Sequence, residues 1–132
     1  MNSAKIFYTS IAGINFRCTP EDMGSIIGYV KEDPENQYNP KAVGVYRLNG
    51  SLLGYVADKD LDKFYEFKGD EEGYDKMVFS GNIKKVVRYD KNFYVGNIAI
   101  IKSQDEDELT ELMNQNFFED FDVYGKTEIV EK

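Results

Sequence analysis

The chain has 132 residues, of which 42% are hydrophobic and 30% charged, with a formal net charge of −8. Its length favours one domain with a hydrophobic core. The chain contains no run of 18 or more apolar residues, so we expect no membrane-spanning helix. The N-terminus lacks the basic and apolar regions of a signal peptide. The only cysteine, Cys18, excludes an internal disulfide and fits a reducing compartment, so we expect a cytoplasmic protein.

The negative charge is concentrated near the C-terminus. Residues 105–122 contain eight acidic residues and no base, which accounts for the whole net charge of −8. The preceding part of the chain is electrically balanced. A pI near 4.6 argues against broad affinity for nucleic acids, but says less about a small local site.

The first half of the chain predicts four strands. Segments rich in β-branched and aromatic residues lie at 5–13, 25–31 and 42–48. Asn49-Gly50 predicts a type I′ hairpin turn into a fourth strand at 51–57. The loop before the second strand contains Pro20 and Gly24, and the turn before the third contains Pro34 and Pro40.

The second half predicts two helices and two more strands. Asp58 is the predicted N-cap of a short helix over 58–67, and a polar loop follows at 69–75. Strands are predicted at 77–89 and 93–102, joined by a tight turn at 90–92. Ser103 is the predicted cap of an acidic helix to about residue 118, and residues 123–132 are expected to pack poorly.

Together these elements predict a mostly β fold: a small six-stranded OB-like or SH3-like barrel with one short helix, followed by an acidic C-terminal helix. Glycines within the predicted strands suit the bends of a small barrel; they are Gly28, Gly44, Gly54, Gly81 and Gly96. We therefore divide the chain into a barrel domain at 1–103, an acidic amphipathic helix at 104–122 and a flexible tail at 123–132.

The acidic helix has an apolar side. Its apolar residues follow helical spacing, with Asn116 at one position of the stripe: Leu109, Leu112, Met113, Asn116 and Phe117. Two interpretations remain open. The helix docks on its own barrel, or residues 105–121 bind a protein partner or a second copy of the chain.

One stretch resembles a known family. Residues 32–43, EDPENQYNPKAV, followed by Gly54-Tyr55-Val56 and a short helix, resemble the signature of the HIRAN domain. The resemblance spans roughly residues 5–102 and is specific in its central block. It implies an OB-like or SH3-like barrel and a module that binds single-stranded DNA at a free 3′-OH end.

The resemblance also implies site residues. Phe16 and Tyr38 would stack on terminal bases, and Asn36 and Asn39 would meet the terminal sugar or base. Tyr55 and Phe93, or its neighbour Tyr94, would line the same pocket. An aromatic platform suits this task because every base has a π-face, and stacking contributes about 1–3 kcal/mol per base. Turn formation by the two asparagines, and packing of the aromatics on the barrel, remain alternative roles.

Three positions depart from the DNA-binding members of the family. Those members have Arg at the position of Asn15, Asp at Asn39 and Lys at Asp58. Asn15 and Arg17, which lies two residues further on, are candidate contacts of the same nucleic-acid site. Because neutralising phosphates supplies much of the affinity for nucleic acid, we expect weaker and more salt-sensitive binding. The alternative is a protein-interaction or oligomeric scaffold that has lost the DNA site.

Other chemistry has little support. Lys84, Lys85, Arg88 and Lys91 form the densest basic group, which predicts either a solvated strand edge or a phosphate track. The chain has no histidine and no nucleophile elbow, Gly-rich phosphate loop or metal-ligand spacing. We therefore expect no cofactor, no metal and no catalysis.

Overall fold

The computed structural model describes residues 4–69, 77–114 and 127–130. The strands are β1 (Ala4–Ala12), β2 (Gly24–Glu32), β3 (Val43–Arg47), β4 (Leu52–Val56), β5 (Met77–Arg88), β6 (Lys91–Lys102) and β7 (Thr127–Val130). The α-helices are α1 (Leu61–Lys68) and α2 (Glu106–Met113). Short 3-10 helices lie at Ile14–Phe16, Pro20–Asp22 and Asp58–Asp60, of which the first is called η1.

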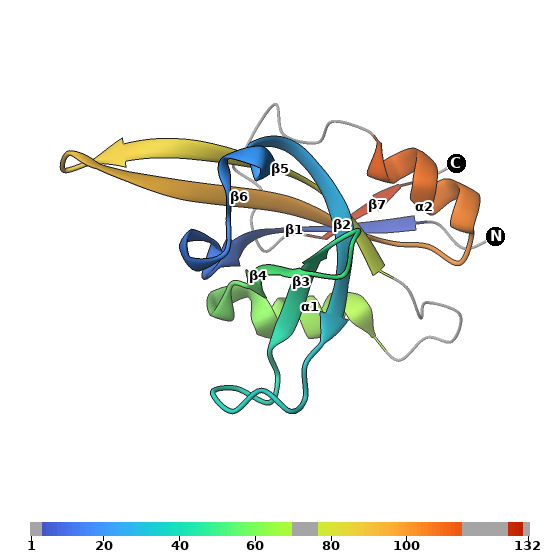
Figure 1. The fold of residues 1–132 in the computed structure, drawn as a ribbon. Helices are drawn as coiled ribbons and strands as arrows, with labels where there is room; N and C mark the ends of the chain where they lie inside the picture. Colours follow the sequence, from blue (N-terminus) through green and yellow to red (C-terminus); the bar gives the residue numbers. More distant parts are fainter. Residues whose placement is uncertain (1–3, 70–76, 115–126, 131–132) are drawn as a thin grey trace.

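Six antiparallel strands form a closed barrel, as the sequence predicted. The strand order is β4-β3-β2-β5-β6-β1, and β1 pairs with β4 to close the circle. This closing pair is short, with Ile11 opposite Val56 and Ala12 opposite Tyr55. The first half of β1 instead pairs with β7 on that edge (Figure 1). The strand β1 therefore switches partners along its length.

Gly54 lies where the barrel closes. A Cβ atom at this position would lie 2.5 Å from Cγ2 of Ile11 and 2.6 Å from the carbonyl oxygen of Ala12. Both distances are shorter than any normal contact, and one partner is backbone that cannot swing away. Only glycine lets β4 approach β1 this closely.

Aromatic and aliphatic side chains fill the barrel. Helix α1 contributes Leu61, Phe64 and Phe67 to this core. The ring of Phe64 meets that of Phe7 edge-on, with 5.9 Å between centroids. The segment before α1 is anchored by Thr9, whose hydroxyl donates to the buried carboxylate of Asp60 at 2.7 Å. Helix α1 is therefore fixed against β1.

A second apolar layer lies on the outer face of the sheet. Leu109 and Leu112 of α2 are buried against residues of β1 and β6 that include Ile6, Ala99 and Ile101. The described part of the acidic helix therefore docks on its own barrel, which is the first of the two predicted alternatives. The predicted continuation with Asn116 and Phe117 lies outside the described residues.

Both helices begin later than the sequence predicted. Asp58 is not the cap of α1; it opens a 3-10 turn, and the N-cap position of α1 is taken by Asp60, whose side chain makes no capping hydrogen bond. The cap of α2 is Asp105, whose carboxylate accepts from the backbone N–H groups of Asp107 and Glu108. Ser103 lies outside the helix and donates to the Glu108 carboxylate at 2.7 Å. At α2 a nearby acidic residue, Asp105, thus takes the place of the predicted cap.

The hairpin turns also differ from the prediction in detail. The β3–β4 hairpin forms, but only Gly50 has positive φ (90°), so the turn is a three-residue loop and not type I′. The β5–β6 turn consists of Tyr89 and Asp90, with φ of 52° and 62°. Lys91 and Asn92, predicted in that turn, belong to β6.

The tail differs as well. Residues 123–132 were expected to pack poorly, yet Thr127–Val130 forms β7, antiparallel to residues 4–7 of β1. The four-residue strand pairs with an edge that the closed barrel leaves open. Sequence patterns did not indicate this edge, because it exists only where β1 diverges from β4.

Candidate functional site

The turn between β2 and β3 is built by its two asparagines. The side-chain oxygen of Asn36 accepts from the backbone N–H groups of Tyr38 (2.9 Å) and Asn39 (3.0 Å). The side-chain oxygen of Asn39 in turn accepts from the N–H of Lys41 at 2.9 Å. These are Asx-type bonds, which shape a turn from within. Their oxygens are thus engaged by backbone, while the Tyr38 ring projects into solvent with 91% of its surface exposed.

The turn is also fastened to the barrel. The N–H of Asp33 donates to the carbonyl of Ala42 across its base at 2.9 Å. The hydroxyl of Tyr65, from α1, donates to the carbonyl of Lys41 at 2.9 Å. Partial burial raises the pKa of Tyr65 above its usual value, with the Glu32 carboxylate adding to the effect. The hydroxyl therefore stays a donor throughout the physiological range.

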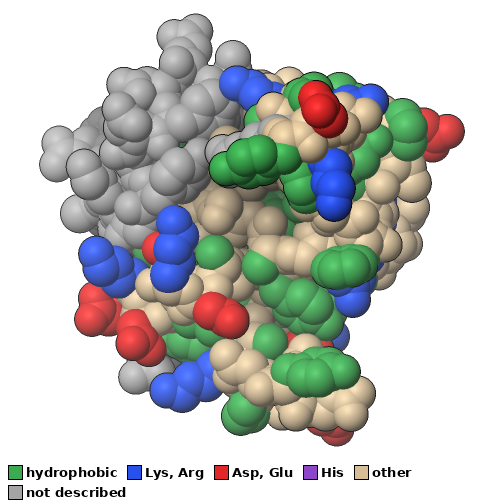
Figure 2. Space-filling model, turned by 90° about the vertical axis from the view of Figure 1, so that its left-hand side faces the viewer, with side chains coloured by type: hydrophobic (Ala, Val, Ile, Leu, Met, Phe, Trp, Pro, Cys, Tyr) green, Lys and Arg blue, Asp and Glu red, His purple; other side chains and the backbone are tan. Residues whose placement is uncertain are grey.

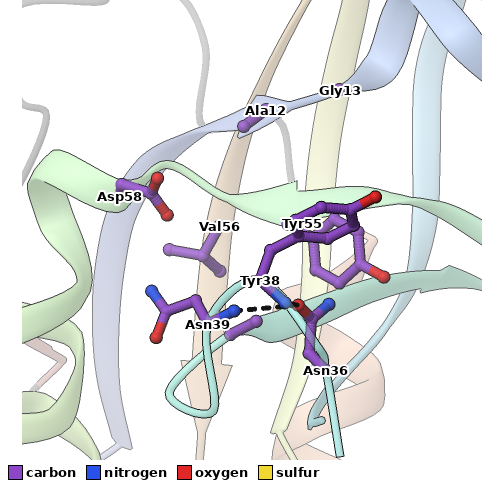
Figure 3. Close-up of a pocket in the computed structure, with 9 residues that line it drawn as sticks. Ala12, Gly13, Asn36, Tyr38, Asn39, Tyr55, Val56 and Asp58 are labelled. Atoms are coloured by element: carbon purple, nitrogen blue, oxygen red, sulfur yellow. Dashed lines mark hydrogen bonds between the residues drawn. The ribbon is translucent and has the colours of Figure 1, made fainter.

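A cavity of about 300 Å³ lies between this turn and the closing pair of strands (Figure 3). Its polar groups come from opposite walls: Asn39 from the turn, and Asp58 from the segment after β4, with Val56 between them. Tyr38 and Tyr55 line the same cavity. The complete lining is Ala12, Gly13, Asn36, Tyr38, Asn39, Ala42, Tyr55, Val56 and Asp58.

A second cavity of about 560 Å³ shares three of these residues. Asn36, Tyr38 and Tyr55 line both cavities, so the two cavities adjoin at the tyrosines, and together they are called the hollow. The second cavity adds Arg17, whose guanidinium lies 5.6 Å from the centre of the Tyr55 ring. It also adds Asp33, Glu35 and Gln37. The hollow therefore combines two aromatic rings with one cation and several carboxylates.

Arg47 holds the loop that carries Arg17. Its guanidinium donates to both carboxylate oxygens of Asp22, at 2.9 and 2.8 Å, and to the carbonyl of Arg17 at 2.7 Å. A paired, two-point contact of this kind is among the stronger polar interactions. The hydrogen bond from Arg47 lowers the pKa of Asp22 from 3.8 to about 2. The position of Arg17 thus depends on an ion pair outside the hollow.

We expect Asp22→Asn to lower the free energy of unfolding at neutral pH by about 1–2 kcal/mol, because it removes the charged partner of Arg47. This is less than the free energy implied by the pKa shift, since solvent screens the pair. A carboxyl with a lowered pKa stabilises the fold above its unfolded pKa near 4, and loses this contribution as the pH falls through 2. The deficit of the variant should therefore shrink between pH 4 and pH 2. Urea unfolding at a series of pH values measures it, with Glu21→Gln as control. A deficit independent of pH would contradict the pair.

The other predicted residues lie elsewhere. The side chain of Asn15 is bonded to β6: it donates to the carbonyl of Tyr94 (3.1 Å) and accepts from its N–H (2.6 Å). Phe16 is 88% exposed beside Arg17 but lines neither cavity. Phe93 lies on the long β5–β6 hairpin and lines neither cavity, while Tyr94 packs against the barrel core.

The structure adds residues that the sequence did not assign to the site. Ala12, Gly13 and Val56 reach the cavity because β1 and β4 meet there, and no local pattern predicts that pairing. Asp33 and Glu35 also line the second cavity. They belong to the signature at residues 32–43, so their closeness to Asn36 and Tyr38 in the sequence could have predicted this position.

The surroundings of Cys18 do not favour a reactive thiol. Burial is the main cause that raises the pKa of the Cys18 thiol, and Asp22 raises it further, so the thiol is less reactive than a free cysteine. Among the described residues, no three His, Cys, Asp or Glu side chains come together in a group that could hold a metal ion. Within the same residues, no helix has the length and apolarity needed to cross a membrane.

Comparison with known proteins gives one structural likeness. Neither a protein-family model nor a curated protein matches the chain. The fold is similar to that in the crystal structure of the HIRAN domain of human HLTF, with a TM-score of 0.45 and 14% sequence identity. The match covers 89% of this chain and 94% of that chain. At this level of similarity the comparison does not establish a family.

Proposed function

We propose that the protein is a non-enzymatic module that binds single-stranded DNA at a free 3′-OH end. The main observation in support is the shared hollow, in which Tyr38 and Tyr55 border two adjoining cavities. The signature in residues 32–43 supports the same function, because its Asn36, Tyr38 and Asn39 all line the hollow.

The two tyrosines supply the stacking surfaces. Tyr38 is almost fully exposed, so a base covering its ring displaces water from an aromatic face that the protein leaves bare. Stacking of this kind tolerates any base. The turn that carries Tyr38 is already ordered by Asn36, so little further ordering opposes binding.

The polar walls suit a hydroxyl. The Asp58 carboxylate can accept a hydrogen bond, and the amide nitrogen of Asn39 can donate one, because only its oxygen is engaged by Lys41 among the described residues. A terminal 3′-OH both donates and accepts, so one such group could satisfy both walls. In this protein Asp58 would supply the carboxylate that the DNA-binding HIRAN domains have at the position of Asn39.

The same carboxylate disfavours phosphate. Among the residues that the structure describes, Arg17 is the only cation that lines either cavity, whereas Asp33, Glu35 and Asp58 are all acids. An end carrying a 3′-phosphate would bring two or nearly two negative charges toward Asp58. We therefore expect selectivity for the hydroxyl end and only modest overall affinity.

Fluorescence anisotropy at low salt tests the proposal on a short 5′-labelled strand with either a 3′-OH or a 3′-phosphate. Wild type should bind the hydroxyl end at least about ten-fold more tightly, since one good charged hydrogen bond is worth 1.5–3 kcal/mol. Asp58→Asn should reduce that ratio, while Asp62→Asn, which removes the same charge from an exposed position on α1, should leave it unchanged. Equal binding of both ends by wild type would refute end recognition.

The alternative is a protein-interaction scaffold that retains the barrel. Among the described residues, the two cavities together contain three carboxylates and one arginine, and this excess of negative charge favours the scaffold because it weakens attraction to any polyanion. Absence of binding to either strand at low salt would support this alternative.

A further inference from the structure

The β5–β6 hairpin continues past the barrel as an arm, defined here as residues 84–95 (Figure 1). Its strands stay paired to the end, where Arg88 lies opposite Lys91. Tyr89 and Asp90 form the two-residue turn with positive φ at both positions, which suits the twist of a hairpin. The arm is therefore a regular two-stranded ribbon with much of its surface in solvent.

Exposed hydrophobic side chains gather on the arm. Of the eight large hydrophobic residues exposed in the described chain, four lie on these twelve residues: Val87, Tyr89, Phe93 and Val95. Tyr89 at the tip is 96% exposed. Phe93 and Val95 are alternate residues of β6 and so share one face of the arm, whereas Val87 pairs with Asn92 on the other face. Neighbouring exposed apolar side chains on one face indicate a surface for binding.

The arm is also basic in an acidic protein. It has four bases and one acid, whereas the whole chain has a net charge of −8. Lys84, Lys85 and Lys91 are exposed. On the side of the molecule from which the arm projects, basic and hydrophobic side chains lie intermixed in the upper part of the view, with acidic side chains among them (Figure 2). Interleaved cations and aromatic rings are typical of surfaces that bind single-stranded nucleic acids.

The register brings the relevant residues onto one face. Phe93 pairs with Val86, and Val95 pairs with Lys84. Directly paired residues share a face, and so do alternate residues along a strand. Lys91, Phe93 and the Val95–Lys84 pair therefore follow one another on one face, about 7 Å apart. The ring of Phe93 has a lysine position on each side along this face.

Two simpler explanations fit less well. Lysines protect an exposed strand edge from pairing with other chains, but exposed Val87, Tyr89 and Phe93 would promote such pairing. Association of two arms would bring like charges together, which opposes it. A polyanion with stacking faces matches both the positive charge of the arm and the exposed ring of Phe93.

We propose that the arm is a second contact region for single-stranded DNA, with Phe93 stacking on a base and Lys84 and Lys91 meeting phosphates. It goes beyond the end site because it needs no free 3′-OH. The two regions are connected by η1: Asn15 is bonded to β6 at Tyr94, and Arg17, two residues later, lines the second cavity. A single DNA strand that leaves the second cavity past Arg17 would therefore meet the arm near Tyr94, where η1 is bonded to β6.

Anisotropy on 5′-labelled oligothymidylates of about 4 and 16 nucleotides tests the arm, with each length carrying a 3′-OH or a 3′-phosphate. Wild type should bind the longer strand roughly ten-fold more tightly, whichever end it carries, since one stacked base and two phosphate contacts are added. Lys84→Gln/Lys91→Gln should abolish most of this gain and reduce the slope of log affinity against log salt by about 1.4. Phe93→Leu, which keeps an apolar side chain, should also reduce the gain.

The matched control is Lys31→Gln/Lys63→Gln, which removes the same charge from exposed positions on β2 and α1. Equal affinities and salt slopes for the arm and control variants would overturn the proposal. So would the absence of a length gain in wild type, or a concentration-dependent dimer in sedimentation that only the arm variant loses. Failure of end recognition would look different: the preference for 3′-OH would vanish while the length gain remained.

Discussion

Tyr38→Ala should weaken binding of a single strand with a free 3′-OH by roughly ten-fold to a hundred-fold, with no loss of stability. The stacking contribution of one ring is about 1–3 kcal/mol. The effect on folding should be negligible because Tyr38 is 91% exposed, and the substitution keeps the backbone N–H that donates to the side chain of Asn36 in the turn. Anisotropy at low salt measures the first effect, and urea unfolding measures the second.

The control for this variant is Tyr38→Phe, which keeps the ring and removes the hydroxyl. It should bind nearly as well as wild type, since stacking uses the π-face and not the hydroxyl. A second control, Leu48→Ala, alters an exposed apolar residue outside both cavities. If Tyr38→Ala bound DNA as tightly as these two, the aromatic wall would have no role in recognition.

Gly54→Ala should lower the free energy of unfolding by about 3 kcal/mol or more, at the upper end of what overpacking costs. The added methyl would lie 2.5 Å from Ile11 and 2.6 Å from the Ala12 carbonyl, so β1 and β4 would have to separate. That separation would also displace Tyr55 and Ala12, which both line the first cavity. We therefore expect a melting temperature lower by roughly 10 °C and weaker binding of DNA ends.

Gly24→Ala provides the matched comparison. A Cβ at Gly24 would meet nothing within 4 Å, but its φ of 90° still disfavours any other residue. Its cost should be about 1–2 kcal/mol and entirely conformational. Binding of DNA ends by this variant should match wild type. Equal destabilisation by the two substitutions would mean that the barrel does not close tightly at Gly54.

Much of the local structure was predictable because it follows from neighbouring residues. The six barrel strands, the two helices and the ordered turn at residues 33–42 all form where periodicity, prolines and asparagines indicated them. The exact ends of the helices and turns could not be predicted, because several neighbouring residues could take the same cap or turn position. Asp105 outcompetes Ser103 as a cap, and Tyr89-Asp90 replaces the predicted turn at 90–92.

The residues of the candidate site also fall into two groups: those placed by their neighbours in the sequence and those placed by the pairing of strands. Asn36, Tyr38 and Asn39 are close in sequence, so their turn signature placed them together, and the structure puts all three on one cavity. Tyr55 joins them because β4 crosses beside the turn. Phe93 does not, because the register of β5 and β6 carries it onto the arm. That register cannot be read from either strand alone.

By itself, the sequence determined the strands, the turn and the acidic C-terminal segment, since each depends on residues a few positions apart. Only the tertiary structure decided which segments come together to form the walls of the first cavity. The short β1–β4 pair brings Ala12 and Tyr55 together, and Asp58, predicted as a helix cap, comes to face Asn39 across the cavity. Contacts of this kind form between residues distant in sequence, so their geometry depends on how the whole barrel closes.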